Sequence, residues 1–304
     1  MVSVLRVLFA FTAVALLSAC SPAEPAAYEP TYDTAPAVPQ AATREILFAV
    51  HPLHNPRRLF EVYQPLVDLI NEHVAPTYRF RLETSRDYAT FEKKLAIGKF
   101  QFAVPNPYQT LQSEAHGYRI IGKMGNDQRF RGIIVMRRDS QRTSINDLKG
   151  APISFPAPTA LAATMMPRMF LYQHGLDAAD IDARYVGSQE SAIMNVLLGK
   201  TIAGGTWPPP WEAFQRRRPA LASQLVVKWE TEPLINNGLV AHGSVSQDVV
   251  RSVSDVVFHL HENPRGKTIL EAMEIDRFEP ANAKAFEPVR HFIAAYETTF
   301  GRKP

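Results

Sequence analysis

Strand-like and helix-like segments alternate along this chain from about residue 44, and this alternation limits its fold more than any other feature. "EILFAV" (45–50) has the apolar run of a buried strand, and helical spacing then links Phe60, Tyr63, Leu66, Val67 and Ile70. "YRFRLET" and "FQFAV" are strand-like, and "DYATFEKKLAIGK" between them is typical of a helix with an Asp cap and a terminal glycine. The pattern predicts an α/β fold with a mainly parallel sheet.

A second series of the same kind follows residue 136. "SINDLKGAPISF" leads into a strand, and "ARYVG", "ESAIMNVLLGK" and "TIAGGTW" continue the exchange of strands and helices. "PLINNGLVAH" then leads back, and the amphipathic "VSQDVVRSVSDVVFHLHE" supplies closing helices. We therefore expect two lobes, the first made of residues 44–136 plus 236–304 and the second of residues 137–235.

The first residues are typical of an export signal. "MVSVLRVLFAFTAVALLSAC" has one basic residue, Arg6, followed by an apolar run that is too short to span a bilayer comfortably. The end "LSAC" resembles the bacterial lipoprotein cleavage box, and the chain has a single cysteine, Cys20, which has no disulfide partner. We expect a signal peptide at 1–19 and lipid attachment at Cys20; the alternative is a plain signal peptidase site.

Composition indicates which segment lies outside the folded lobes and which kinds of partner the protein has. Residues 20–43 are rich in Pro and Ala, and such a segment predicts a disordered tether. A formal net charge of +3 is too small to indicate a nucleic-acid partner. The triplet Arg216 to Arg218 is either a patch for anionic lipid or an ordinary solvated surface.

Catalytic motifs are missing from the sequence. There is no G-x-S-x-G or H-E-x-x-H pattern and no G-x-x-x-x-G-K followed by Ser or Thr, and no group of His, Cys, Asp or Glu has metal-ligand spacing. His259 and His261 lie two apart on a helical pattern and so point to different faces. We therefore expect neither an enzyme nor a cofactor or metal.

Several segments together resemble the periplasmic solute-binding proteins of phosphate, phosphite and phosphonate ABC importers. They occur in the order "YQPLVDLINE", "GKFQFAVPNPYQTL", "SINDLKGAPISFPAPTALAATMMP", "VGSQESAIMNVLLGK", "PLINNGLVAH" and "RFEPANAKAFEPVRHF". The resemblance covers nearly the whole chain after the tether. It implies a type II periplasmic-binding-protein architecture, in which two α/β lobes close on a ligand that is then delivered to a membrane permease.

The resemblance also indicates where a ligand would bind. Tyr108 in "PNPY" is similar to the family's P-x-x-Y tyrosine, and its hydroxyl can donate to an anion while its ring walls the cleft. "HPLHNP" follows the first strand and offers His54 and Asn55 to the same cleft. Each of these side chains also has a purely structural interpretation.

The loop "PTALAATMMP" departs from the family. Where phosphonate binders have a Ser-Thr-Ser-Gly-like run, this chain has Ala160 followed by Leu-Ala-Ala, with Thr159 and Thr164 on either side. Gln189 stands where the family often has a histidine, and Ile202 where it usually has an acidic residue. Trp207 offers an aromatic wall. These changes favour a ligand that is less charged, or one held by backbone amides and aromatic surface.

The expected ligand site therefore comprises His54, Asn55, Tyr108, Thr159, Ala160, Gln189 and Trp207. The predicted function is that of a monomeric, periplasmic, lipid-anchored binding protein that captures a phosphonate- or phosphate-like solute for an ABC permease. The alternative is a ligand-sensing adaptor for a membrane signalling protein such as a histidine kinase, because ligand-driven closure serves both roles equally well.

Overall fold

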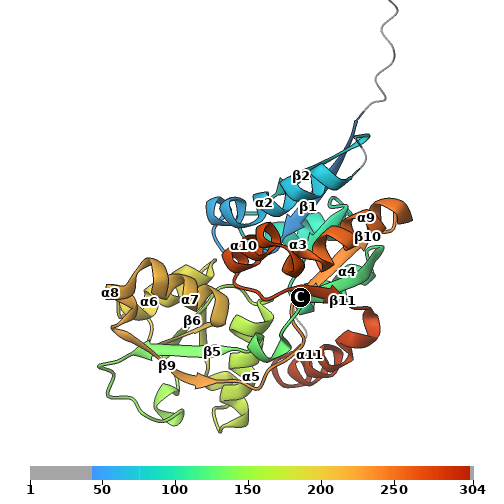
Figure 1. Cartoon of the computed structure of the whole chain (residues 1–304). Helices are drawn as coiled ribbons and strands as arrows, with labels where there is room; N and C mark the ends of the chain where they lie inside the picture. The colour runs from blue at the N-terminus through green and yellow to red at the C-terminus, as the bar shows by residue number, and fades with distance from the viewer. Residues whose placement is uncertain (1–42, 75, 302–304) are drawn as a thin grey trace, which may run out of the picture. The chain divides into compact units, whose positions relative to one another are not determined.

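A computed structural model describes residues 43–74 and 76–301 of the chain (Figure 1). The predicted signal peptide, Cys20 and nearly all of the predicted tether lie outside these residues. No helix within the described part of the chain is both long enough and apolar enough to cross a membrane.

Lobe 1 is built on a six-stranded sheet with the order β11-β4-β10-β3-β1-β2. The strands are β1 (Arg44–Val50), β2 (Tyr78–Glu83), β3 (Phe102–Val104), β4 (Tyr118–Met124), β10 (Gly238–His242) and β11 (Phe278–Pro280). The helices of this lobe are α2 (Pro56–His73), α3 (Tyr88–Ala96), α4 (Pro107–Glu114), α9 (Gln247–Phe258), α10 (Pro264–Met273) and α11 (Glu287–Phe300). Its strands thus come from two separate stretches of the chain.

Lobe 2 is built on a five-stranded sheet with the order β7-β6-β8-β5-β9. The strands are β5 (Ile133–Arg137), β6 (Pro152–Phe155), β7 (Asp182–Tyr185), β8 (Ala203–Thr206) and β9 (Leu225–Glu230). The helices are α5 (Met166–Gln173), α6 (Gln189–Leu197), α7 (Pro208–Arg217) and α8 (Pro219–Ala222). Between the two sheets the chain passes through residues 125–132 and again through residues 231–237.

Both sheets are mixed, which corrects the expectation of mainly parallel sheets. In lobe 1, β1 is parallel to β2 and β3, but β10 is antiparallel to β3 and β4. In lobe 2, β6 is parallel to β7 and β8, but β5 is antiparallel to β8 and β9. Helical crossovers within a lobe join the parallel strands, whereas β5 and β10 enter their sheets from the other lobe and are free of that constraint.

Local sequence explains where the helices that border the cleft begin. Asn55 caps α2, with its side chain accepting a hydrogen bond from the amide of Arg58, and Pro56 follows in the first turn. Asn106 caps α4 and forms a capping box with Gln109, again followed by a proline. Both helices therefore start directly after a strand, at the edge of the sheet where ligands bind in open α/β folds.

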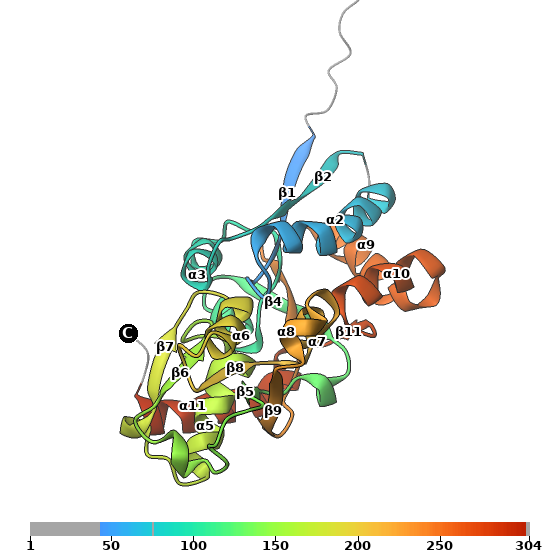
Figure 2. The same cartoon turned by 90° about the vertical axis from the view of Figure 1, so that its left-hand side faces the viewer.

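One continuous apolar cluster joins the core of lobe 1 to a segment of lobe 2. The lobe 2 members are Ala157, the run from Ala160 to Ala163, Met165, Met166, Met169 and Trp207. Figures 1 and 2 both place α11 beside α5, and Arg168 of α5 donates to the hydroxyl of Tyr296 in α11 over 2.6 Å. The two lobes are therefore in direct contact along one side of the cleft.

The arginine triplet noted in the sequence pairs with carboxylates. Arg216 pairs with Glu274 at the end of α10, while Arg218 approaches Glu190 within 2.9 Å and Arg217 approaches the same carboxylate within 3.8 Å. Burial raises the pKa of Glu274 to about 7, against the opposing influence of Arg216. Arg216 thus joins α7 of lobe 2 to α10 of lobe 1.

Candidate functional site

A small cavity lies between the lobes, at the carboxyl ends of strands from both sheets. It is lined by His51, Tyr88, Asn106, Phe130, Ala160, Leu161, Ala162, Ala163, Gln189, Trp207 and Asn237, and we call it the interlobe cavity. The volume open to the centre of a water molecule is about 10 Å³. This is about the least that can hold one water, so the lobes are closed around almost no free space.

The loop that departs from the family forms one wall of this cavity. Residues Leu161–Met165 make a single π-helical turn that runs into α5, and all five are buried. The amide of Thr164 is the first to donate along this turn, to the carbonyl of Ala160 over 2.8 Å. Within the described part of the chain nothing accepts from the amides of Leu161, Ala162 and Ala163, as expected at a helix N-terminus.

Two glycines allow other segments to pack closely against this loop. A Cβ at Gly205 of β8 would lie 2.2 Å from the carbonyl oxygen of Ala163, and one at Gly132 would lie 2.5 Å from that of Ala162. Both distances are shorter than any real contact, so a side chain at either place would displace the loop. The position of the loop therefore depends on residues far from it in sequence.

Thr159 bonds across the lobes and does not line the interlobe cavity. Its hydroxyl donates to the carboxylate of Glu92 in α3, which also accepts from Gln109 Nε2 over 3.1 Å. Asn106 Nδ2 donates to the carbonyl of Thr159 over 2.9 Å. Thr159 is thus held from both its side chain and its backbone by lobe 1.

Gln189 lies in the cavity as expected, but its amide is engaged by protein groups. Its Nε2 donates to the hydroxyl of Tyr88 over 3.2 Å, and its Oε1 accepts from the hydroxyl of Thr206 over 3.0 Å. Because the Tyr88 hydroxyl accepts one bond, it keeps its own hydrogen for a ligand. Burial raises the pKa of Tyr88, so this hydroxyl stays protonated.

Trp207 also lines the cavity, whereas Trp211 does not. The Trp207 ring meets Phe130 edge-on, with 5.4 Å between the ring centroids. Trp211 stacks on Phe214 at 6.0 Å within the core of lobe 2. The aromatic wall of the cavity therefore comes from Trp207 and from Phe130, which lies in the first crossing between the lobes.

His51 and Asn237 complete the cavity, although neither is among the expected site residues. His51 Nδ1 donates to the carbonyl of Val104 over 3.0 Å, which leaves Nε2 as an acceptor. Burial lowers the pKa of His51 to about 4, so the ring is neutral near pH 7. Asn237 is fully buried with Nδ2 against the sulfur of Met124, and no group of the described chain donates to its Oδ1.

A signal for Asn237 exists in the sequence. The doublet in "PLINNGLVAH" places two amides immediately before a strand, in the segment that returns the chain to lobe 1. Because β10 is antiparallel to β3 and β4, this crossing brings Asn237 to the sheet edge where those two strands end. His51 directly follows a buried strand, which is the position that open α/β folds use for ligands.

The other expected residues lie elsewhere. Asn55 is exposed and serves as the cap of α2, and His54 is buried with its pKa lowered to about 3 by burial and by the charges of Arg58 and Arg217. Tyr108 lines a second pocket together with Thr159. Of the seven expected residues, the structure brings Ala160, Gln189 and Trp207 together in the interlobe cavity.

The interlobe cavity offers neutral hydrogen-bonding groups and no formal charge. Among the described residues that line it, none is Asp, Glu, Lys or Arg, and its one histidine is neutral near pH 7. It combines donors, the three loop amides and the Tyr88 hydroxyl, with acceptors at His51 Nε2 and Asn237 Oδ1. Such a site can hold a ligand that both accepts and donates hydrogen bonds.

Two lobes that close on a cavity at the ends of their strands define a type II periplasmic binding protein. A family model described as the periplasmic substrate-binding protein of phosphonate ABC transporters matches residues 48–286. The chain belongs to this family, whose members deliver their substrate to an ABC permease. No match was found among curated protein sequences.

Solved structures share the fold at low sequence identity. PhnD1 from Prochlorococcus marinus, in complex with methylphosphonate, is 17% identical with a TM-score of 0.76, and the match covers 83% of this chain and 98% of that one. A binding protein of an ABC phosphonate transporter from Pseudomonas aeruginosa is 16% identical with a TM-score of 0.77, covering 84% and 88%. The alkanesulfonate-binding protein SsuA from Xanthomonas axonopodis pv. citri, bound to MOPS, is 15% identical with a TM-score of 0.59, covering 85% and 94%.

Proposed function

We propose that this protein captures a small phosphonate- or phosphate-like solute in the interlobe cavity and delivers it to an ABC permease. The observation that carries the proposal is the run of backbone amides at Leu161, Ala162 and Ala163. These residues line the cavity, and their amides donate no hydrogen bond to any described residue. Amides at a helix N-terminus bind oxyanions through their hydrogens and the helix dipole. They do so without the hydroxyl side chains that the loop lacks.

The neutral lining favours a ligand that still carries one proton. A monoprotonated phosphonate accepts hydrogen bonds through two oxygens and donates one through its P–OH group. The amides and the Tyr88 hydroxyl match the accepting oxygens, and His51 Nε2 or Asn237 Oδ1 matches the donor. A fully ionised phosphonate would leave both acceptors unpaired against a second negative charge, which is unfavourable in a buried site.

Binding requires the lobes to separate from the closed arrangement. A phosphonate has three oxygens on phosphorus, and the space of about 10 Å³ holds one water at most. Opening breaks the bonds of Thr159 to Glu92 and Asn106, and closure on a ligand re-forms a related set. The ligand then shifts the equilibrium by its greater affinity for the closed state.

The remaining parts of the proposal concern the setting of the protein. Members of the family are periplasmic, and we propose that this chain is a monomer tethered to the membrane by lipid on Cys20. A single lipidated cysteine ahead of a Pro-rich tether would keep the lobes near a permease while leaving them free to close.

A sensing role is the second candidate, and one observation favours it. The chain closes its own cleft with protein–protein hydrogen bonds and with apolar packing of the loop against lobe 1. A binding protein with such contacts between its closed lobes could report ligand to a membrane signalling protein such as a histidine kinase, instead of supplying a permease.

The test is calorimetric titration of the full chain with methylphosphonate, phosphate and phosphite across a range of pH. We expect saturable binding that weakens as the pH rises past the second pKa of each ligand, because the monoanion is the bound form. Ligand at about a hundred times its dissociation constant should also stabilise the protein by about 2.7 kcal/mol. If none of the three compounds binds at any pH, the phosphonate assignment is wrong.

A further inference from the structure

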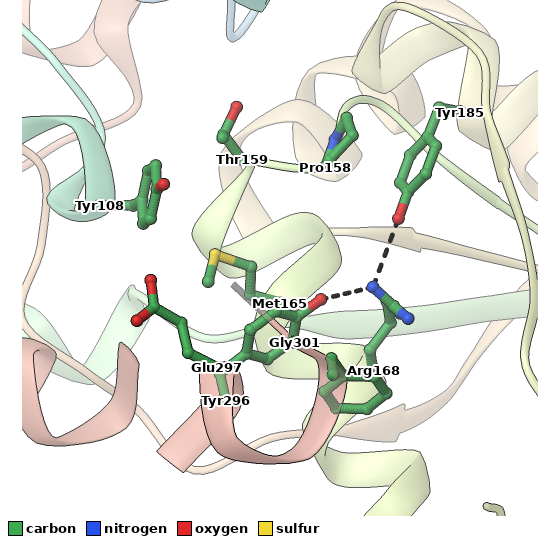
Figure 3. Close-up of a pocket in the computed structure, with 10 residues that line it drawn as sticks. Tyr108, Pro158, Thr159, Met165, Arg168, Tyr185, Tyr296, Glu297 and Gly301 are labelled. Atoms are coloured by element: carbon green, nitrogen blue, oxygen red, sulfur yellow. Dashed lines mark hydrogen bonds between the residues drawn. The ribbon is translucent and has the colours of Figure 1, made fainter. Parts of the chain in front are cut away.

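A second pocket is lined in part by the residues that flank loop residues 160–163, and it is larger than the interlobe cavity (Figure 3). Its volume is about 170 Å³, and we call it the Arg168 pocket. It is lined by Tyr108, Pro158, Thr159, Met165, Arg168, Tyr185, Tyr296, Glu297, Phe300 and Gly301. Nothing in the proposed phosphonate site accounts for this pocket.

The guanidinium of Arg168 is fixed at one end of the pocket. It lies 4.3 Å from the ring centroid of Phe300 and 5.7 Å from that of Tyr296, which is cation–π range for both rings. It donates to the hydroxyl of Tyr296 over 2.6 Å and to that of Tyr185 over 3.3 Å. Because each hydroxyl accepts from a cation, each retains a hydrogen that can be donated to an anion.

The opposite end of the pocket carries negative charge. Figure 3 shows the Glu297 carboxylate on the Tyr108 side and Arg168 on the Tyr185 side, with Met165 between them. Glu297 adds a carboxylate and Tyr108 an aromatic ring, the two groups that most favour an organic ammonium. Pro158 and Met165 supply apolar surface between the two ends.

The geometry points to a binding site for a small zwitterion, whose oxyanion meets the Tyr185, Tyr296 and Arg168 end and whose ammonium meets the Glu297 and Tyr108 end. The class that fits is a short amino acid with an apolar linker between its charges. Because the two ends of the pocket carry opposite charges, such a ligand should bind more tightly than compounds that carry only one of the two charges.

Residues of both lobes line the Arg168 pocket, so a ligand bound there also affects how the lobes close. Tyr108 begins α4 and Glu297 lies in α11 of lobe 1, whereas Arg168 and Tyr185 belong to lobe 2. A ligand that touches all of them stabilises the closed arrangement of the lobes. Occupation of this pocket should therefore raise the affinity of the interlobe cavity, and the reverse.

The test is calorimetric titration of the full chain with a length series of probes: glycine, β-alanine, γ-aminobutyrate and ε-aminohexanoate. We expect at least one length to bind saturably, and the alkylamine and the fatty acid of that same length to bind at least about tenfold more weakly, as loss of one charge-assisted contact predicts. Failure of all lengths to bind would overturn the proposal, and so would equal binding by the singly charged compounds.

Variants of the lining residues test whether the zwitterion binds in the Arg168 pocket. Tyr185→Phe removes one donor from a side chain that is 44% exposed, so the fold is retained, and it should weaken the best zwitterion at least about tenfold. Glu297→Gln should do the same from the other end. Tyr172→Phe is the matched control, because Tyr172 is 41% exposed and does not line the pocket, and it should leave zwitterion affinity unchanged. If Tyr185→Phe and Glu297→Gln bind the zwitterion as tightly as Tyr172→Phe does, the zwitterion binds elsewhere and the proposal is wrong.

Discussion

The interlobe cavity and the Arg168 pocket are separated by one stretch of chain, residues 159–168, and they offer different chemistry to a ligand. The interlobe cavity is lined by buried, neutral groups, whereas the Arg168 pocket includes the exposed Tyr185 and Gly301 and has a charge of each sign among its lining residues. Ala160 to Ala163 line the first, and Met165 and Arg168 line the second. The loop at residues 160–163 thus lines the interlobe cavity, and the residues that follow it line the Arg168 pocket.

The difference shows that charge is not concentrated where the family resemblance locates the ligand. Arg168 is bonded and stacked outside the interlobe cavity, and burial keeps both His51 and Tyr88, the titratable rings among its described lining residues, neutral near pH 7. Burial is cheap for neutral groups that find partners and costly for unpaired charge. A nearly sealed cavity and a partly open pocket therefore carry the chemistry that each environment tolerates.

The largest expected effect comes from placing a charge in the neutral cavity. Asn237→Asp adds a carboxyl group at a fully buried position with no cation among the lining residues, which should destabilise the protein by about 3 kcal/mol near pH 7. The same charge should abolish phosphonate binding. Urea unfolding and calorimetry measure the two effects.

The matched control for this change is Asn282→Asp. Asn282 caps a short helix by accepting from the amide of Lys284, a role that Asp fills equally well, so stability should stay within about 0.5 kcal/mol. Equal losses in the two variants would mean that the cavity tolerates charge after all.

The pH dependence of stability gives the next effect. His51 has a folded pKa of about 4 against an ordinary value of 6.5, so below 6.5 the unfolded chain binds a proton that the folded chain does not. Stability therefore falls as the pH drops from 6.5 to 4, by about 3 kcal/mol from this residue, and levels off below that range.

His51→Gln should remove this part of the slope. His54 has its pKa lowered to about 3 and supplies a slope of the same sign, which remains in the variant. Chemical unfolding at several pH values between 4 and 7 compares the two proteins. Identical slopes for wild type and His51→Gln would show that this ring is solvated in solution.

A smaller effect is expected from the hydrogen bonds that hold the cleft closed. Thr159→Val keeps the shape of the side chain but removes its bond to the Glu92 carboxylate, at a cost of about 1.5 to 3 kcal/mol for the closed state. Small-angle scattering should show a larger radius of gyration for the variant without ligand. An unchanged radius would mean that apolar packing alone keeps the lobes together.

The smallest effect separates the two sites most clearly. Tyr108→Phe should leave methylphosphonate affinity within about twofold, because Tyr108 lines the Arg168 pocket and not the interlobe cavity. Calorimetry with methylphosphonate is the measurement. A loss of tenfold or more would place Tyr108 at the phosphonate, as the family's P-x-x-Y tyrosine implies.

The sequence determined the fold class, the two series of strands and helices, the family, and the loss of hydroxyls in the loop after β6. These properties follow from local periodicity, caps and residue order, which act over a few residues. The mixed strand directions did not follow, because they depend on how the chain enters each sheet after crossing between lobes.

Only the tertiary structure decided which side chains face a ligand. The place of Thr159 in the loop predicts a donor to the cleft, but Glu92 and Asn106 from the other lobe take up its polar groups. Asn237 reaches the cavity because β10 returns from lobe 2 beside β4, and Arg168 faces away because α5 packs against α11. Burial and pairing across the lobes arise from contacts between residues distant in sequence, which no local pattern encodes.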